Sequence, residues 1–439
     1  MLMQSSKNDE DANLMDPDAV GMSRQKLSEL DSVVQGHVGS GKIQGAVVAV
    51  SRYGKPVYFE AHGYSDLNTK TPMKLDSMFQ MASSTKPVTG VAAMIAMEKG
   101  LFEADHEVQE FISSFSEIRV AVLADPEAKD ISPKFVWPSL DKNGKTPGRL
   151  LKLFGRIYGR LTKKYYGYVP SHRTVRVKRP VTIHDLLTHT SGLGSFGLGT
   201  AVSDWNKKPW ETHLEQNTLA SHVEDVAKGP LDFQPGSRWM YSPGTGLDVV
   251  ARIIEITSGQ PFNEFVQENI FDPLDMKDTH WKVPLEKYSR VVVIRGDKDD
   301  WKKQISYYSG SYGLISTARD FLHFQEMLAN GGELLGNRIV NLDSVTRMSS
   351  NQVGSLYYGK AKRGDDTNSE GFGYTVSITL DSENSSIPHG NGAFGWGGAA
   401  GTYSWSEPAS GIAAVIMVQQ PSKEVPFDIA KVVQDSIAD

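Results

Sequence analysis

The stretch Phe79-Gln-Met-Ala-Ser83-Ser-Thr-Lys86-Pro87 places a hydroxyl and an amine three residues apart, at the predicted start of a helix. Residues i and i+3 share one helix face, so the Lys86 amine can reach the Ser83 Oγ without help from distant sequence. A serine hydroxyl becomes an effective nucleophile when a nearby base takes its proton, and Ser-x-x-Lys supplies both groups within one turn. The same tetrapeptide also fits a capping serine followed by a surface lysine. The rest of the chain has to decide between these two interpretations.

Hydrophobic spacing around the motif predicts an ordered series of helices. The motif helix continues to Lys99, and Pro87 is tolerated because the first helical N–H groups have no intrahelical partner. Its predicted buried face consists of Val88, Val91, Ala92 and Ile95. Further helices are predicted at 23–38, 182–188, 245–258, 262–270, 317–330, 343–349 and 426–437.

Strand-like segments lie near both ends of the chain, at 45–51, 56–61, 401–407 and 411–418. The simplest topology is one antiparallel sheet built from both chain ends, flanked by helices, with a mainly helical domain inserted between them. This is an α+β fold. The predicted divisions are a disordered tail at 1–18, an α/β sheet domain at 19–105 and 310–439, and a helical domain at 106–309.

Composition restricts the classes of function. The chain has 439 residues and no cysteine, which excludes thiol catalysis, disulfides and cysteine-ligated metal sites. Its formal net charge of -6 argues against general nucleic-acid binding, which favours basic chains. Neither a signal-peptide apolar region nor a run of about 18 apolar residues is present, so we expect a cytoplasmic protein without a membrane span. No cofactor and no metal site are predicted.

The segment at about 124–178 reads as a basic insertion in the helical domain. From Lys142 to Arg179 it contains no Asp or Glu. Its basic residues at 149, 152, 156, 160 and 163 form one stripe of a predicted amphipathic helix. Three interpretations stay open: a lid helix with its basic side in water, a surface for an acyl carrier or other anionic partner at 142–179, and an anionic membrane surface.

A second candidate for chemistry is Tyr241, in the run Pro235-Gly-Ser-Arg-Trp-Met-Tyr241-Ser242-Pro243-Gly244. The run precedes a predicted helix, and a tyrosine on such a loop can project its phenol into a cleft. Beside a lysine, a phenol can pass protons. Taken alone, the run fits a buried tyrosine with a satisfied hydroxyl better than a reactive one.

A third candidate is the glycine-rich run Phe394-Gly-Trp396-Gly397-Gly398-Ala399-Ala-Gly401-Thr402. Glycines at this density beside a strand let the backbone approach a ligand closely. We expect an exposed sheet edge here, whose N–H groups can stabilise an oxyanion. The alternative is an ordinary loop beside an edge strand.

The three runs occur in the order of the Ser-x-x-Lys, Ser-Asp-Asn and Lys-Thr-Gly set of β-lactamases and penicillin-binding proteins. On these residues the chain resembles the serine β-lactamase-related superfamily, specifically its esterase and acyltransferase branch, which is similar to class C β-lactamases. The resemblance covers about 23–420 apart from the basic insertion. Further matching runs begin at Val181, which leads to His189-Thr-Ser191-Gly-Leu193, and at Ser311 and Leu328.

The resemblance implies a role for each motif residue. Ser83 would be the acylated nucleophile. Lys86 would deprotonate it or hold the proton network, and Tyr241 would be the partner base that protonates the leaving group. Trp396, Gly397 and Gly398 would replace Lys-Thr-Gly. The backbone N–H groups of Ser83 and Ala399 would form the oxyanion hole. His189 and Ser191 invite a Ser-His interpretation, but in this family their turn is structural.

Two departures from the β-lactamase pattern narrow the expected function. Tyr241-Ser-Pro243 lacks the usual asparagine, and Trp396 stands where a lysine attracts the carboxylate of penicillins. We therefore expect hydrolysis of carboxylic esters through acyl-Ser83. The alternatives are acyl transfer to a small-molecule alcohol or amine in secondary metabolism, weak β-lactamase or D-peptidase activity, and a non-enzymatic binding or assembly role.

Overall fold

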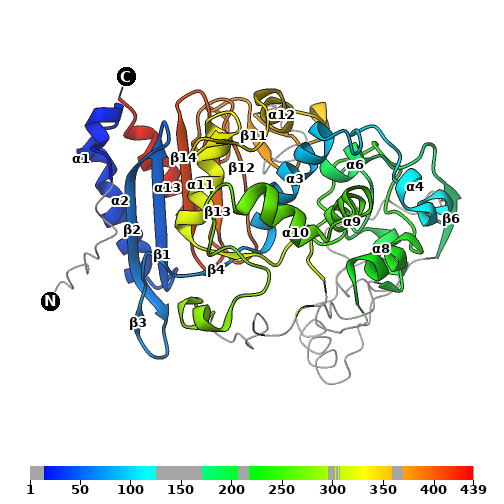
Figure 1. The fold of residues 1–439 in the computed structure, drawn as a ribbon, viewed down its shortest axis with the longest axis horizontal. Coiled ribbons are helices and arrows are strands. Elements are labelled where there is room, and N and C mark those ends of the chain that lie inside the picture. The colour runs from blue at the N-terminus through cyan, green and yellow to red at the C-terminus, as the bar shows by residue number, and fades with distance from the viewer. Residues whose placement is uncertain are drawn as a thin grey trace. The chain divides into compact units, whose positions relative to one another are not determined.

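The computed structural model describes residues 14–124, 171–205, 217–294, 302, 305, 307–357 and 369–438 (Figure 1). The predicted basic helix at 149–163 lies outside these residues. Residues 14–18, assigned from sequence to a disordered tail, are part of the fold: the Met15 N–H donates to the Pro56 carbonyl (2.8 Å). Within the described residues, no helix is both long and apolar enough to cross a membrane.

Contacts divide the chain into two units. The first contains Met1–Gly100, Gln260–Gln304 and Tyr312–Asp439, and the second contains Leu101–Gly259 and Ile305–Ser311. The division differs from the sequence-based one in grouping 260–304 with the sheet. The reason is pairing: Met78 bridges Val291 and His280 bridges Ile315, so this segment is tied to strands of the first unit.

One antiparallel sheet dominates the first unit, in the strand order β10-β11-β12-β13-β14-β1-β2-β3. Its strands are β1 (Gly45–Arg52), β2 (Lys55–Asp66), β3 (Thr71–Pro72), β10 (Glu370–Phe372), β11 (Ser377–Thr379), β12 (Phe394–Gly397), β13 (Tyr403–Glu407) and β14 (Ile412–Met417). Two short sheets pair β4 (Phe79–Gln80) with β7 (Ile315–Ser316), and β8 (Glu333–Leu334) with β9 (Asn337–Arg338).

The sheet unites both chain ends, which confirms the predicted α+β fold. β1 pairs with β14 from Val47↔Met417 to Arg52↔Ile412. The flanking segments are also joined, since the Ser23 N–H donates to the Ser436 carbonyl (2.7 Å). The helices of this unit are η2 (Pro17–Val20), α1 (Arg24–Leu27), α2 (Glu29–Gly39), η3 (Ala82–Thr85), α3 (Lys86–Glu98), α10 (Phe262–Val266), η6 (Gln267–Phe271), η7 (Leu285–Arg290), α11 (Ala318–Ala329), α12 (Leu342–Met348), η9 (Gly354–Leu356) and α13 (Glu424–Asp435).

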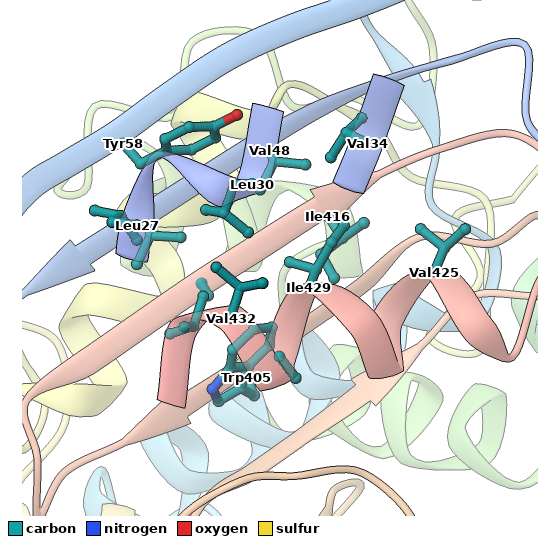
Figure 2. Close-up of a cluster of buried hydrophobic side chains, with 14 of the residues drawn as sticks. Leu27, Leu30, Val34, Val48, Tyr58, Trp405, Ile416, Val425, Ile429 and Val432 are labelled. Carbon is teal, nitrogen blue, oxygen red and sulfur yellow. The ribbon is translucent and has the colours of Figure 1, made fainter. Parts of the chain in front are cut away.

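Helices cover both faces of the sheet, so every residue of β1 is buried. Figure 2 shows the first of these layers, where α2 and α13 pack side chains such as Leu30 and Ile429 against Val48 and Trp405. On the other face, α11 is held by a buried polar network. Gln325 Nε2 donates to Ser404 Oγ (2.9 Å), and Ser406 Oγ donates to Gln325 Oε1 (2.7 Å).

The helix predicted to carry the motif is α3, preceded by the single 3₁₀ turn η3. It is not amphipathic as predicted, because every residue from Lys86 to Met97 is buried. Other elements of the unit surround it: α12, α10, η6 and β12 all contact α3. Gly90 marks the tightest approach, since a Cβ there would lie 2.3 Å from Thr375 Oγ1. A helix that is apolar all round is typical of such a central position.

The second unit is mainly helical. Its elements are α4 (Val108–Phe111), η4 (Ser113–Glu117), β5 (Arg119–Leu123), β6 (His172–Arg176), α6 (Ile183–Leu187), α7 (Leu198–Val202), α8 (Leu219–Ala227) and α9 (Gly246–Ser258). Helix α6 begins at a capping box of Thr182 and Asp185. Helix α9 ends at Gly259, whose left-handed conformation (φ 72°) suits glycine at a helix C-terminus.

Trp405 tests the packing of the sheet. Its indole is fully buried, and its Nε1 has no hydrogen-bond partner among the described residues. Trp405→Ala should lower the free energy of unfolding by about 3–5 kcal/mol, whereas Trp405→Phe, which removes the unpaired N–H, should cost about 1 kcal/mol or less. Leu285→Ala, at a side chain 76% exposed, is the control and should change stability by less than about 0.5 kcal/mol. Denaturant unfolding measures all three, and equal losses for the two Trp405 variants would contradict the packing argument.

Candidate active site

Ser83 lies on a turn that is fastened before and after the residue. The preceding strand β4 pairs with β7, and both backbone groups of Gln80 bond the side-chain amide of Gln419 (3.1 and 3.2 Å). The Met81 N–H then donates to the Leu314 carbonyl (2.8 Å). Ser83 itself is half-buried, so its hydroxyl is held by a fixed backbone while part of the residue stays accessible.

Ala82 adds a feature that no sequence pattern indicated. Its φ of 46° places a non-glycine residue in the left-handed region, directly before Ser83. Such a conformation costs on the order of 1–3 kcal/mol, and strained residues of this kind cluster at functional sites. This conformation of Ala82 turns the chain sharply from β4 into η3. It therefore sets the direction of the Ser83 side chain.

Lys86 is in contact with Ser83, as the i, i+3 spacing predicted. It is the first residue of α3 and is fully buried. Its Nζ donates a hydrogen bond to Ser83 Oγ over 3.3 Å. Residues i and i+3 eclipse one another on a 3₁₀ turn, which brings the two side chains together. When the amine is neutral, the same contact lets it accept the serine proton.

The glycine-rich run forms the end of β12 and the turn after it. It is not the sheet edge predicted from sequence, because β12 lies between β11 and β13. The ladder to β11 ends at Gly395, whereas the ladder to β13 continues to Gly397. The rings of Trp396 and Phe372 pack edge to face, with their centroids 5.4 Å apart. Ala399, in the turn, is exposed.

Gly398 joins this turn to the serine turn. A Cβ at position 398 would lie 2.3 Å from the Met81 carbonyl oxygen, and this contact excludes any larger residue. The approach explains why glycine is needed here for packing and not for an unusual φ. Ser83, Lys86, Trp396, Gly397, Gly398 and Ala399 therefore all belong to one unit, and two of its chain segments touch at Met81 and Gly398.

Tyr241 belongs to the second unit, on the loop before α9, where it is half-buried. The buried His189 ring packs edge-to-face on the Tyr241 ring, with centroids 4.9 Å apart. The Ser242 N–H donates to His189 Nδ1 (3.4 Å), and the Met240 N–H donates to the His189 carbonyl (3.0 Å). His189 thus holds the backbone on both sides of Tyr241 as well as its ring.

The His189 turn is itself anchored by charge. Asp185, fully buried at the start of α6, accepts two hydrogen bonds from Arg179 (2.6 and 2.8 Å) and one from Thr190 Oγ1 (3.2 Å). The bond to Asp185 raises the pKa of Arg179. Ser191 Oγ accepts the Leu193 N–H (3.2 Å). These contacts give the His-Thr-Ser-Gly run a structural use.

A second buried carboxylate, Asp248, belongs to none of the motifs found in the sequence. It lies on α9, and its Oδ1 accepts Ser309 Oγ (2.6 Å) and the Ser311 N–H (3.0 Å). His222 on α8 places its Nε2 3.7 Å from Asp248 Oδ2. Burial raises the pKa of Asp248, and the charge of His222 opposes that shift. The group fixes the segment around 309–311 to α8 and α9 within the second unit.

The described part of the predicted basic insertion is small. It comprises β6 and the residues after it, where Arg173, Arg176 and Lys178 are exposed. Arg119, on β5, lies directly opposite Arg176. A surface for an anionic partner at 142–179 stays a prediction, because most of that segment lies outside the described residues.

Two curated esterases are similar to the chain in sequence, and a solved hydrolase structure is similar in fold. Lovastatin esterase of Penicillium rubens is 28% identical over 326 residues, which is 70% of this chain and 69% of the esterase. Esterase EstB of Burkholderia gladioli is 25% identical over 433 residues, or 92% and 93% of the two chains. The solved structure of EstCE1, a hydrolase with promiscuous acyltransferase activity, has a TM-score of 0.68 at 21% identity and covers 93% of this chain and 98% of its own.

A family model settles the relationship. The model described as Beta-lactamase matches residues 30–438, and so includes all three motif runs, the whole second unit and most of the first. The resemblance inferred from Ser83, Tyr241 and Trp396 is thereby confirmed. The chain belongs to the beta-lactamase family.

Proposed function

We propose that the protein is a serine hydrolase of carboxylic esters that works through an acyl-Ser83 intermediate. One observation carries the proposal: Lys86 Nζ lies 3.3 Å from Ser83 Oγ, with Lys86 fully buried at the start of α3. The pairing of a hydroxyl with an adjacent base defines an activated nucleophile. Esterases among the relatives support the substrate class.

In the acylation step, Ser83 Oγ attacks the ester carbonyl carbon and a C–O bond forms. The serine proton passes to Lys86, whose Nζ lies beside Ser83 Oγ. The tetrahedral intermediate then collapses, the bond to the leaving oxygen breaks, and a proton passes to that oxygen. The family resemblance alone assigns this last transfer to Tyr241. An alcohol leaves, and the acyl group stays on Ser83.

In the deacylation step, water attacks the acyl carbon and gives up its proton to the base that took the serine proton. The Ser83–acyl bond breaks, Ser83 recovers its proton, and a carboxylic acid leaves. Both steps pass through an oxyanion. We assign its stabilisation to the backbone N–H groups of Ser83 and Ala399, because Gly398 brings the chain just before Ala399 against the serine turn.

Trp396 favours neutral substrates over penicillins. An indole carries no charge, so it offers no ion pair to a substrate carboxylate, which a lysine at this position would supply. Its ring packs edge to face with the Phe372 ring, with centroids 5.4 Å apart, and contributes an apolar, aromatic surface. Esters without a carboxylate beside the scissile bond are therefore the proposed substrates.

Acyl transfer is the second candidate, since EstCE1 is a hydrolase with promiscuous acyltransferase activity. The same acyl-Ser83 serves both reactions, and only the acceptor differs. An alcohol or amine that attacks in place of water forms a new ester or amide.

The nucleophile assignment predicts that Ser83→Ala loses at least about 10³-fold in ester hydrolysis, because the proposed acyl-enzyme forms on the Ser83 Oγ. The free energy of unfolding should change by less than about 1 kcal/mol. Turnover of p-nitrophenyl butyrate gives the rate, and mass spectrometry locates the trapped acyl group. Ser84→Ala is the matched control and should still be acylated at Ser83. Substantial turnover by the Ser83 variant would remove the proposal.

The charge argument predicts the effect of Trp396→Lys. The ratio of kcat/KM for a carboxylate-bearing ester to that for its neutral analogue should rise about tenfold, which corresponds to about 1.4 kcal/mol of ion pairing. Trp396→Met, of similar length but uncharged, separates the charge from the loss of the ring and should leave the ratio near that of the wild type. The assignment of position 396 to substrate charge recognition fails if both variants shift the ratio equally.

A shared acyl-enzyme predicts how products divide. With a primary alcohol added at increasing concentration, the ratio of new ester to free acid should rise linearly, because alcohol and water compete for one intermediate. Chromatography of the products measures the ratio. If acid alone forms at every alcohol concentration, hydrolysis stands and the transferase alternative falls.

A further inference from the structure

Thr402 stands out as a buried polar residue that the reaction steps do not use. It follows the turn after β12, is 1% exposed, and contacts both chain segments that meet beside Ser83. We propose that Thr402 is a positioning residue: its hydroxyl fixes the serine turn against the β12 turn and so sets the spacing of the two oxyanion donors. This inference rests on the proposed function.

The Thr402 hydroxyl contacts the chain on both sides of Ser83. Thr402 Oγ1 donates to the Met81 carbonyl over 3.2 Å, two residues before Ser83. Ser84 Oγ lies 3.0 Å from the same Thr402 oxygen. A threonine has only one hydroxyl proton, and Met81 takes it, so Ser84 must be the donor in the second bond. The result is a directed chain from Ser84 through Thr402 to Met81 that brackets the nucleophile.

The backbone of Thr402 holds the other segment. Its carbonyl accepts the Gly398 N–H (2.7 Å), and the Gly401 N–H donates to the Gly398 carbonyl (2.9 Å). The Thr402 side chain also lies close to the Gly398 main chain, since a Cβ at 398 would lie 2.3 Å from Thr402 Oγ1. Thr402 therefore bonds Met81 through its hydroxyl and Gly398 through its carbonyl.

The positions of the proposed oxyanion donors follow from these bonds. Ser83 lies between the two residues that the Thr402 hydroxyl contacts, and Ala399 directly follows the residue that the Thr402 carbonyl contacts. Preorganised donors act only when their distance to the developing oxyanion is right, and a misplacement of about 1 Å can cost on the order of 100-fold in rate. Loss of the hydroxyl should therefore affect the transition state and leave substrate binding unchanged.

The test compares Thr402→Val, which keeps the shape without the hydroxyl, with Thr402→Ser, which keeps the hydroxyl without the methyl group. For p-nitrophenyl butyrate, Thr402→Val should lower kcat by about 10- to 100-fold with KM within about twofold of wild type. Thr402→Ser should recover most of kcat. A merely structural role would lower the melting temperature of Thr402→Val while the folded fraction kept wild-type kcat.

Three results would overturn the inference: wild-type kcat in Thr402→Val, equal losses in the Val and Ser variants, or a loss confined to KM. Should Thr402→Val fail to fold, Thr402→Ala cannot overpack the site and replaces it in the comparison with Thr402→Ser. Ser83→Ala is measured in parallel. Activity in that variant would reject the proposed function itself, whereas an inactive Ser83→Ala beside a fully active Thr402→Val rejects only the role of Thr402.

Discussion

The contact between Gly398 and the Met81 carbonyl is the constraint on which the rest of the first unit depends. It joins the sheet, through the turn after β12, to the turn that carries Ser83. With a Cβ excluded at 2.3 Å, the two backbones meet directly. Helix α3 then continues from this junction with Lys86 as its first residue, buried on every side by elements of the same unit. Backbone packing thus fixes the position of Ser83, the proposed nucleophile.

Local sequence was enough to predict the parts of the site that depend on spacing along the chain. Ser83 and Lys86 meet because they lie three positions apart on one turn. The strands at both ends are predicted because each is a short apolar run bounded by turn residues. The same local patterns could not reveal contacts between distant segments. Neither the left-handed φ of Ala82, nor the interior position of β12, nor the grip of Thr402 on Met81 has a signature in its own neighbourhood. The buried Asp248 reads as an ordinary polar residue until its partners on another segment are known.

The residues proposed for substrate charge and for proton transfer lie in different units of the chain. Trp396, held by Phe372, contributes an uncharged surface in the first unit. In the second unit, Tyr241 is held by His189, whose turn is anchored in its own right by Asp185 and Arg179. A histidine that attracts notice as a triad member can therefore serve a family reaction by holding another residue in place. The distinction matters for reading motifs, because a conspicuous residue type does not by itself identify the group that reacts.

The pairing of β1 with β14 also affects how the protein folds during its synthesis. β1 is largely apolar and wholly buried, yet its partner β14 and the covering helix α13 come far later in the chain. During synthesis at roughly 5–20 residues per second, β1 leaves the ribosome long before β14 exists. Such distant pairing slows folding, since a very long loop must close before the contact can form. The nascent chain therefore carries an open strand edge while the residues between β1 and β14 are made, and such an edge can pair with other chains.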